Sequence, residues 1–417
     1  MWSRIRSYIV WIASGVALNG LLFVLGTAIG AFGPSVLAKT TQQPLSIAPV
    51  IAASIFPAVI ATAIRLVVGR LVRPWSRAQK YWRNITVLLL LLSFGSPVQG
   101  LSGHNTLSVV ILCAMHVVSA VTIFMGLSWI TRPRWTFGSD WSPKVTGNGE
   151  LAVVTGATSG IGKAVALQLH DLGFNVVGVG RSATFPSAEM ETSPRYRLIT
   201  ADLSSVKNAV QAGQSVVEFD NRPVHLVVHC AGTLKATTKQ TEDGIDENFA
   251  TSFLGRLALT TALKTDEQTR FVIVGAAESG RLSKGMQKPI NSTEDIGTGL
   301  QAHGKAQLAN DLWTARIKRL GFRAFGYGPG SVTSNIRREV PKLIERAMGV
   351  FFAPATRQAS DAARDIVRLL LDDSLPKSGF ASRDGLFDHH PFIENVQNQD
   401  ALFGFAQTAI EKQGESR

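Results

Sequence analysis

The sequence predicts an all-α transmembrane domain of four helices, followed by an α/β domain with a doubly wound parallel sheet. Four apolar stretches occupy the first third of the 417 residues. Beyond residue 150, short apolar runs alternate with amphipathic segments, as in parallel strands joined by helices. The glycine-rich turn "TGATSGIG" separates the first such run from the first such segment. The predicted boundaries are 1–135 for the membrane domain, 136–149 for a linker and 150–417 for the α/β domain.

Each apolar stretch is near or above the length of about 20 residues that a spanning helix needs. The first is too long for the apolar core of a signal peptide, and no clean cleavage motif follows it. The third is the weakest, because its second half carries Ser96, Pro97 and Gln99. The predicted spans are 8–32, 46–69, 82–101 and 106–131.

The basic residues alternate between the connections of these spans. Arg4 and Arg6 precede the first span, five basic residues fill the second connection, and two arginines follow the fourth span. The first connection has only Lys39, and the third has only His104. This alternation predicts a multi-pass protein of the cell membrane with its N-terminus and its C-terminal domain in the cytoplasm. Residues 1–150 carry +10 of the net charge of +12. The excess of positive charge is therefore explained by the basic residues of the membrane domain, and no nucleic-acid partner is expected.

Two ionisable side chains lie within the predicted spans. Arg65 is near the end of the second span, from which its long side chain can extend to the surface. His116 lies in mid-span, either as a functional group or as a neutral ring hydrogen-bonded between helices. The layout "SFGSP…MHVV" resembles a family of uncharacterised four-helix bacterial membrane proteins, which implies no activity. The two cysteines, Cys113 and Cys230, indicate neither a disulfide framework nor a metal site.

The glycine turn of the α/β domain has the residues that a dinucleotide site needs. Three glycines permit a tight turn, a close approach of the backbone to a pyrophosphate, and packing of the next helix on the strand. The N-terminus of that helix then faces the phosphates with unpaired N–H groups. The predicted strands of the sheet are 151–155, 175–180, 197–201, 224–229, 270–275, 323–327 and a short one at 379–382.

The pattern Thr-Gly-x-x-x-Gly-Ile-Gly, with "ADLSS", "HCAG" and "GPGSVTS" in the same order, resembles the short-chain dehydrogenase/reductase family over about residues 150–412. The details are most similar to the retinol-dehydrogenase-like branch. The resemblance implies a Rossmann fold and a nicotinamide dinucleotide cofactor, with Ser334 where a threonine is commoner. The positions implied to bind the cofactor are Thr155, Gly156, Ser159, Gly160, Ile161, Gly162, Asp202, Leu203, Cys230, Ala231, Gly232, Lys305, Pro329, Gly330 and Val332.

The end of the second predicted strand indicates which cofactor is bound. An acidic residue at this place binds the ribose hydroxyls of NAD, whereas an arginine suits the 2′-phosphate of NADP. This chain has Arg181 there, 19 residues beyond Gly162. The sequence therefore predicts NADP, with NAD less favoured and a solvated arginine as the alternative.

The resemblance implies four catalytic positions, and this chain keeps one of them. Lys305 is present, but the tyrosine position is Gln301, the serine position is Ala276 and the asparagine position falls on Ser252. An amide cannot donate and recover a proton as a phenol does, and a methyl group cannot polarise a carbonyl. The loss of a positioned acid costs about 10²–10⁴ in rate, so the family's mechanism cannot run unaltered.

Other residues are conceivable substitutes for the missing acid. Glu278 and Ser279 follow the fifth predicted strand, where a relocated acid or a plain surface loop are both possible. His303 is two positions beyond Gln301 on a predicted helix, so it points about 200° away and is expected to face outward. Lys305 can act alone as a weak proton donor, or only bind the ribose.

Two functions of different class follow. One is a membrane-anchored NADP-dependent oxidoreductase with an altered active site, acting on a lipophilic carbonyl or alcohol. The other is a non-catalytic NADP-binding module that senses or scaffolds for the membrane domain. Both need the same cofactor motifs, so turnover of lipophilic aldehydes distinguishes them.

Overall fold

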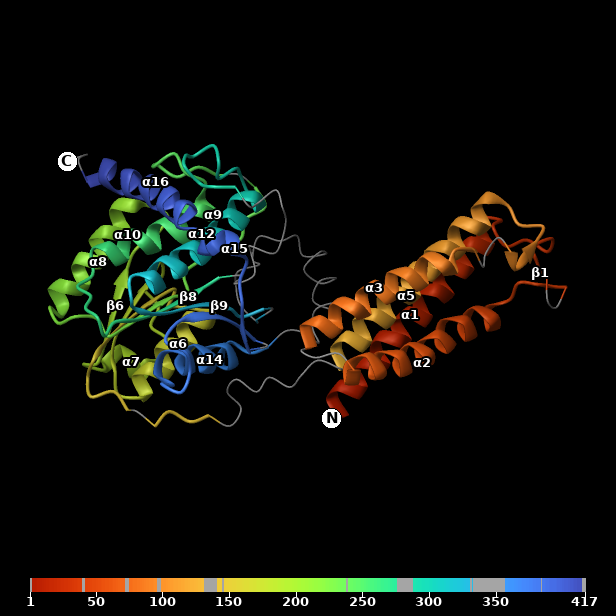
Figure 1. Ribbon diagram of the computed structural model, residues 1–417, viewed down its shortest axis with the longest axis horizontal. Coiled ribbons are helices and arrows are strands. Elements are labelled where there is room, and N and C mark those ends of the chain that lie inside the picture. The colour runs from red at the N-terminus through yellow and green to blue at the C-terminus, as the bar shows by residue number, and fades with distance from the viewer. Residues whose placement is uncertain are drawn as a thin grey trace. The chain divides into compact units, whose positions relative to one another are not determined.

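Figure 1 shows the computed structural model of the chain, which divides into two compact units, Met1–Arg134 and Trp135–Arg417. Each unit is described by itself. The structure describes residues 2–39, 42–71, 75–95, 99–130, 141–144, 146–237, 239–275, 288–330, 332, 357–383 and 385–414.

The N-terminal unit is helical. Its helices are α1 (Trp2–Ala28), α2 (Ile47–Leu71), α3 (Trp75–Ser93) and α5 (Thr106–Ile130). Three of them are long and apolar enough to cross a membrane, over Tyr8–Ala28, Ile47–Val68 and Thr106–Ser128. The apolar part of α3 is shorter, Tyr81–Ser93. Three apolar helices thus fit a membrane domain, and a fourth span stays a prediction.

A small sheet that the sequence did not predict joins two of the connections. Strand β1 (Leu37–Ala38) pairs with β2 (Gln43–Pro44) and with β3 (Leu101–Ser102), both antiparallel. The first connection and the segment before α5 therefore lie together, at the end of the unit remote from its N-terminus (Figure 1). The predicted alternation of basic residues also places these two connections on the same side of the membrane.

The prediction that Arg65 extends to the surface is wrong. Its side chain is fully buried, with 0% exposed. The physical reason is helical spacing, since Ala58, Ala61 and Arg65 recur at intervals of three and four residues and share one face of α2. Ala58 and Ala61 belong to the hydrophobic cluster that packs this face inside the unit.

The C-terminal unit is built on one mostly parallel sheet with the order β11-β10-β9-β8-β7-β4-β5-β6. Every predicted strand is present, with its ends shifted by at most two residues. Only β11, which pairs antiparallel with β10, was not predicted. The strands are β4 (Leu151–Thr155), β5 (Asn175–Gly180), β6 (Tyr196–Thr200), β7 (Leu226–His229), β8 (Arg270–Val274), β9 (Arg323–Gly328), β10 (Gly379–Ser382) and β11 (Gly385–Phe387).

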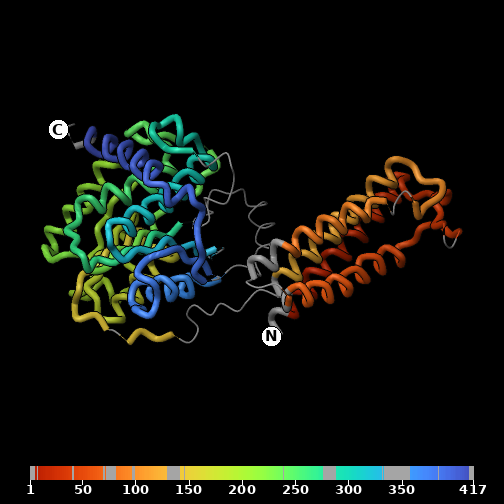
Figure 2. The backbone as a smooth tube through the Cα atoms, in the orientation of Figure 1, coloured from red at the N-terminus to blue at the C-terminus, as the bar shows by residue number. Residues whose placement is uncertain are grey.

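Helices cover both faces of this sheet, and each face has its own hydrophobic cluster. The strand β4 is buried along its whole length, as parallel strands between two helical layers are. Figure 2 shows the C-terminal segment α16 returning across the unit to pack on α8 and α12. One layer has α6 (Gly160–Asp171), α7 (Ala188–Thr192) and α14 (Ala359–Leu371), and the other has α8 (Val206–Phe219), α9 (Glu247–Phe249), the π-helix η1 (Ala250–Leu254), α10 (Gly255–Thr261), α12 (Leu300–Arg319), α15 (Pro391–Glu394) and α16 (Val396–Gly414).

Candidate nucleotide-binding and catalytic site

The strand order defines where a ligand binds in this unit. Strand β4 lies between β5 and β7, so the chain winds in one direction before β7 and in the other after it. In open parallel sheets, ligands bind at the carboxyl ends of the strands at this reversal point. The glycine turn of residues 156–162 directly follows β4 and therefore occupies that place.

The glycine turn requires glycines at the two positions that pack most closely. Gly156 has φ +72°, and a Cβ there would lie 2.8 Å from the backbone nitrogen of Ala231. A Cβ on Gly162 would overlap the carbonyl oxygen of Gly156. The turn therefore lies against the segment after β7, and the start of α6 lies against the turn. Any side chain at these positions displaces the backbone.

The N-terminus of α6 is available to an anion. Its N-cap residue, Ser159, makes no hydrogen bond from its side chain to the helix. The N–H of Lys163 donates to the carbonyl of Ser159 at 3.2 Å. The N–H groups of Gly160, Ile161 and Gly162 come earlier and have no carbonyl one turn before them within the helix. With the helix dipole, these groups form a site for a phosphate.

The segment after β7 is tied to the glycine turn through Thr155. The N–H of Cys230 donates to the carbonyl of Thr155, and the N–H of Ala231 donates to its hydroxyl, both at 3.2 Å. Burial raises the pKa of the Cys230 thiol to about 12, so this side chain is a neutral thiol at pH 7. Gly232 is also closely packed, because a Cβ there would lie 2.9 Å from Nη2 of Arg256.

The residues predicted for the adenosine side lie after β5 and β6. Arg181 is exposed at the end of β5, and Asp202 is exposed after β6. Oδ1 of Asp202 accepts a hydrogen bond from the N–H of Ser204 at 3.0 Å. Leu203 is buried, and its carbonyl closely approaches Gly255. These positions lie at the carboxyl ends of the strands, where the glycine turn also lies.

The segment after β9 reaches these carboxyl ends as well. Pro329 and Gly330 directly follow β9, and Gly330 has φ +69°. Val332 forms an isolated parallel bridge with Arg357, which holds this segment beside the start of the chain leading to α14.

Lys305 is buried on α12, with 3% of the residue exposed. Its Nζ donates to the carbonyl of Lys288 at 3.2 Å. Burial lowers the pKa of the Lys305 ammonium, and the charge of Asp295 opposes that shift. Gln301, one turn earlier on α12, is exposed, and a Cβ on Gly297 would lie 2.5 Å from its side-chain amide carbon. The Gln301 side chain therefore packs against residue 297, and its assignment to the family's tyrosine position stays a prediction.

Ser252 is fully engaged in structural hydrogen bonds. It lies in the π-helix η1 and is 1% exposed. Its Oγ accepts from the N–H of Thr233 at 3.2 Å, and its carbonyl accepts from Nδ2 of Asn310 at 3.0 Å. The hydroxyl thus joins η1 to the segment after β7, and the backbone carbonyl joins η1 to α12.

The prediction that His303 faces outward is wrong. Its Nδ1 donates to the carbonyl of Thr233 at 2.9 Å, and burial, with a smaller effect of the Arg256 charge, lowers the pKa of the ring. The reason is that the segment after β7 packs against this face of α12, so a rotation of about 200° from the exposed Gln301 turns the half-buried ring toward Thr233. Ala276, Glu278, Ser279 and Ser334 lie outside the described residues.

Sequence reasoning missed three buried polar residues that shape this site. Nδ2 of Asn248 donates to the carbonyl of Gly299 at 2.8 Å, and the N–H of Gly299 donates to Asp246 at 2.9 Å. Together they fix the residue that precedes α12. Arg256 is buried, donates to the carbonyl of Val274 at 2.8 Å, and has its pKa lowered to about 10 by burial. The polar run "DEN", directly before an apolar segment, was the available signal for the first two.

The fold and the glycine turn define an α/β domain of the Rossmann type. Residues 150–285 match the family described as short chain dehydrogenase, and residues 2–132 match a family of unknown function, DUF6069. The C-terminal unit therefore carries a short-chain dehydrogenase domain with a Rossmann fold.

Similar proteins include two dehydrogenases of Mus musculus. Retinol dehydrogenase 12 is 25% identical over 281 residues, which are 64% of this chain and 88% of the relative. Polyprenol dehydrogenase is 34% identical over 161 residues, 36% of this chain and 47% of the relative. Among solved structures, the 3-alpha-hydroxysteroid dehydrogenase from Pseudomonas sp. B-0831 complexed with NADH has 21% identity and a TM-score of 0.44, covering 56% of this chain and 95% of that one.

Proposed function

We propose that the protein is a membrane-anchored oxidoreductase of the short-chain dehydrogenase/reductase type that binds NADP and acts on a lipophilic carbonyl or alcohol. The proposal rests foremost on the glycine turn, whose backbone leaves no room for side chains at Gly156 and Gly162 and directs the start of α6 at a phosphate site. Apolar helices and relatives named for retinol and polyprenol support a lipophilic substrate. The proposed domains are 1–135, 136–149 and 150–417.

The residues of this chain have separate roles in such an enzyme. The nicotinamide cofactor, when bound, supplies or accepts the hydride. The N–H groups at the start of α6 hold the pyrophosphate, Asp202 and Leu203 flank the adenine, and Arg181 pairs with the 2′-phosphate. Lys305 holds the ribose and keeps a positive charge beside the reacting group. With Gln301 and Ala276 in the other positions, proton transfer depends on Lys305 or on a relocated acid such as Glu278.

A non-catalytic NADP-binding sensor or scaffold coupled to the membrane domain is the second candidate. The position of Gln301, resting on residue 297, and the structural use of Ser252 favour it. We test the two functions by measuring NADPH oxidation by the full-length protein with a panel of lipophilic aldehydes. Robust turnover supports the enzyme, and nucleotide binding without turnover supports the sensor.

The full-length protein is expected to bind NADPH about 10–100-fold more tightly than NADH, because hydrogen bonds to charged groups contribute about 1.5–3 kcal/mol. Arg181→Asp is expected to reverse this preference, and calorimetry measures both affinities. Lys377→Asp is the matched control, since Lys377 is exposed and precedes β10, at the opposite edge of the sheet. Equal affinities for the two cofactors in the unaltered protein would remove Arg181 from the site.

Reporter fusions at positions 102 and 145 are expected to report opposite sides of the membrane, with position 145 cytoplasmic. The first reason is the alternation of basic residues between the connections. The second is that β1 in the first connection pairs with β3 before α5, which places both at the same end of the unit. The apolar part of α3 is only Tyr81–Ser93, so the proposed crossing of this helix rests on the basic residues and on the shared sheet. The same side for both reporters would show that α5 does not cross.

A further inference from the structure

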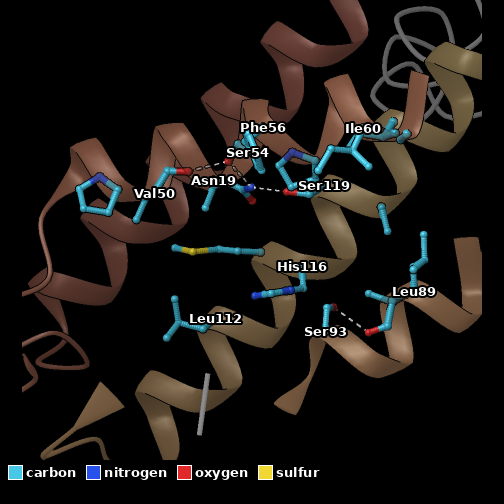
Figure 3. Close-up of a pocket in the computed structure, with 18 of the residues that line it drawn as sticks. Asn19, Val50, Ser54, Phe56, Ile60, Leu89, Ser93, Leu112, His116 and Ser119 are labelled. Atoms are coloured by element: carbon cyan, nitrogen blue, oxygen red, sulfur yellow. Dashed lines mark hydrogen bonds between the residues drawn. The ribbon is translucent and has the colours of Figure 1, made fainter. Parts of the chain in front are cut away.

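The membrane unit contains a cavity of about 560 Å³ between α1, α2, α3 and α5 (Figure 3). This volume falls within the range of about 300–1,000 Å³ typical of small-molecule sites. Its lining is mostly aliphatic and aromatic, with Val50, Phe56, Ile60, Leu89 and Leu112 among its residues. The cavity therefore has the size and the lining to hold one apolar small molecule.

One polar group on this lining lacks a partner. Asn19 of α1 is 2% exposed, and its Nδ2 donates to Oγ of Ser54 at 2.9 Å and to Oγ of Ser119 at 2.8 Å (Figure 3). Both N–H groups of the amide are thus used. Its Oδ1 is buried and has no hydrogen-bond partner among the described residues. Because Ser54 donates its own hydroxyl proton to the carbonyl of Val50, that hydroxyl does not satisfy Oδ1.

Two further groups make the cavity a recognition site and not only a gap between helices. Trp82 of α3 lines it and is 1% exposed, and its Nε1 has no acceptor among the described residues. His116 projects into it from α5 (Figure 3). A buried acceptor or donor left unpaired in apolar surroundings is unfavourable, so Oδ1 of Asn19 and Nε1 of Trp82 indicate a ligand that supplies the missing hydrogen bonds.

The cavity opens through apolar side chains. Phe56 and Ile60 of α2 and Leu89 of α3 line it, and they are 68%, 48% and 45% exposed. Phe56 and Ile60 lie within the candidate span Ile47–Val68. In a membrane this opening faces hydrocarbon, from which a lipid-soluble molecule enters and water does not.

We propose that this cavity binds one molecule of a lipophilic alcohol, with its hydroxyl donating to Oδ1 of Asn19 and its apolar chain lying along α2 and α3. The free group of Asn19 accepts and cannot donate, so a hydroxyl gains a hydrogen bond at Asn19 that an ether, ester, ketone or aldehyde does not. Binding here needs neither nucleotide nor turnover, so the inference goes beyond the proposed oxidoreductase and stands or falls independently of it.

The test uses the full-length protein in lipid nanodiscs without nucleotide, with tritiated farnesol as the probe. Saturable binding of one farnesol per chain is expected. Unlabelled farnesyl methyl ether, which has the same chain and no donor, is expected to compete about tenfold less well than unlabelled farnesol. Binding no greater than that of empty nanodiscs, or equal competition by alcohol and ether, overturns the proposal.

Variants locate the site. Asn19→Leu is expected to lower farnesol affinity about tenfold and to leave the affinity for the ether unchanged. Ser14→Leu on the same helix is the matched control, because this hydroxyl is turned to the carbonyl of Val10 in an exposed position. Ala120→Phe fills the cavity from α5 and is expected to abolish binding of both probes. This variant also tests the proposal if Asn19→Leu does not fold. A farnesol preference that survives Asn19→Leu, or binding that survives Ala120→Phe, overturns the proposal.

Discussion

The double substitution Gln301→Tyr plus Ala276→Ser is expected to raise NADPH oxidation with a generic lipophilic aldehyde by about 10²-fold or more over the unaltered protein. Position 301 is one helical turn before Lys305 on α12, so a phenol there lies on the same side of the helix as the ammonium that lowers its pKa. The serine supplies the donor that polarises the carbonyl. Absorbance of NADPH measures the rate with the full-length protein.

Two controls accompany this prediction. Gln301→Phe plus Ala276→Ser has the same ring without the hydroxyl and is expected to stay at the level of the unaltered protein. Each single substitution is expected to give less than the pair, because an acid and a polarising donor act as a unit. Turnover of the unaltered protein that is lost on Glu278→Gln would instead identify a relocated acid. Turnover that persists after Lys305→Ala would show that α12 is wrongly aligned with the family's catalytic helix.

The substitution Gly162→Ala is expected to lower NADPH affinity by about 100-fold, equivalent to about 2.7 kcal/mol. An added Cβ overlaps the carbonyl oxygen of Gly156, so the start of α6 must move and its N–H groups lose their alignment on the phosphates. Forcing an atom into packed backbone also destabilises the fold by about 1–3 kcal/mol. Calorimetry measures the affinity, and thermal unfolding without nucleotide measures the stability.

Gly404→Ala is the matched control for this effect. Gly404 lies on α16, and a Cβ there meets no atom within 4 Å. The same methyl group is expected to leave the NADPH affinity unchanged and to stabilise the helix by up to about 1 kcal/mol. An unchanged affinity in folded Gly162→Ala protein would mean that the nucleotide does not bind at the start of α6.

The strand pattern and the glycine turn were predictable because each depends on residues close together in the chain. Alternating runs predicted every parallel strand to within two residues, including the short strand β10. The spacing of Gly156, Gly160 and Gly162 specified a turn between β4 and α6, and the turn is there. The residues at positions 301, 276 and 252 can be read directly from the sequence, but their assignment to the family's catalytic positions stays a prediction.

The surroundings of individual polar side chains were decided only by the tertiary structure. His303 donates to Thr233, 70 positions earlier, and Asn19 donates to Ser119, 100 positions later. Helical periodicity states the direction of a side chain from its own axis, but not which other element covers that direction. For this reason the outward prediction for His303 and the surface prediction for Arg65 were wrong, and the cavity around Asn19 had no signal in the sequence. Packing between distant segments determines which of these groups are buried and which of their hydrogen bonds are left for a ligand.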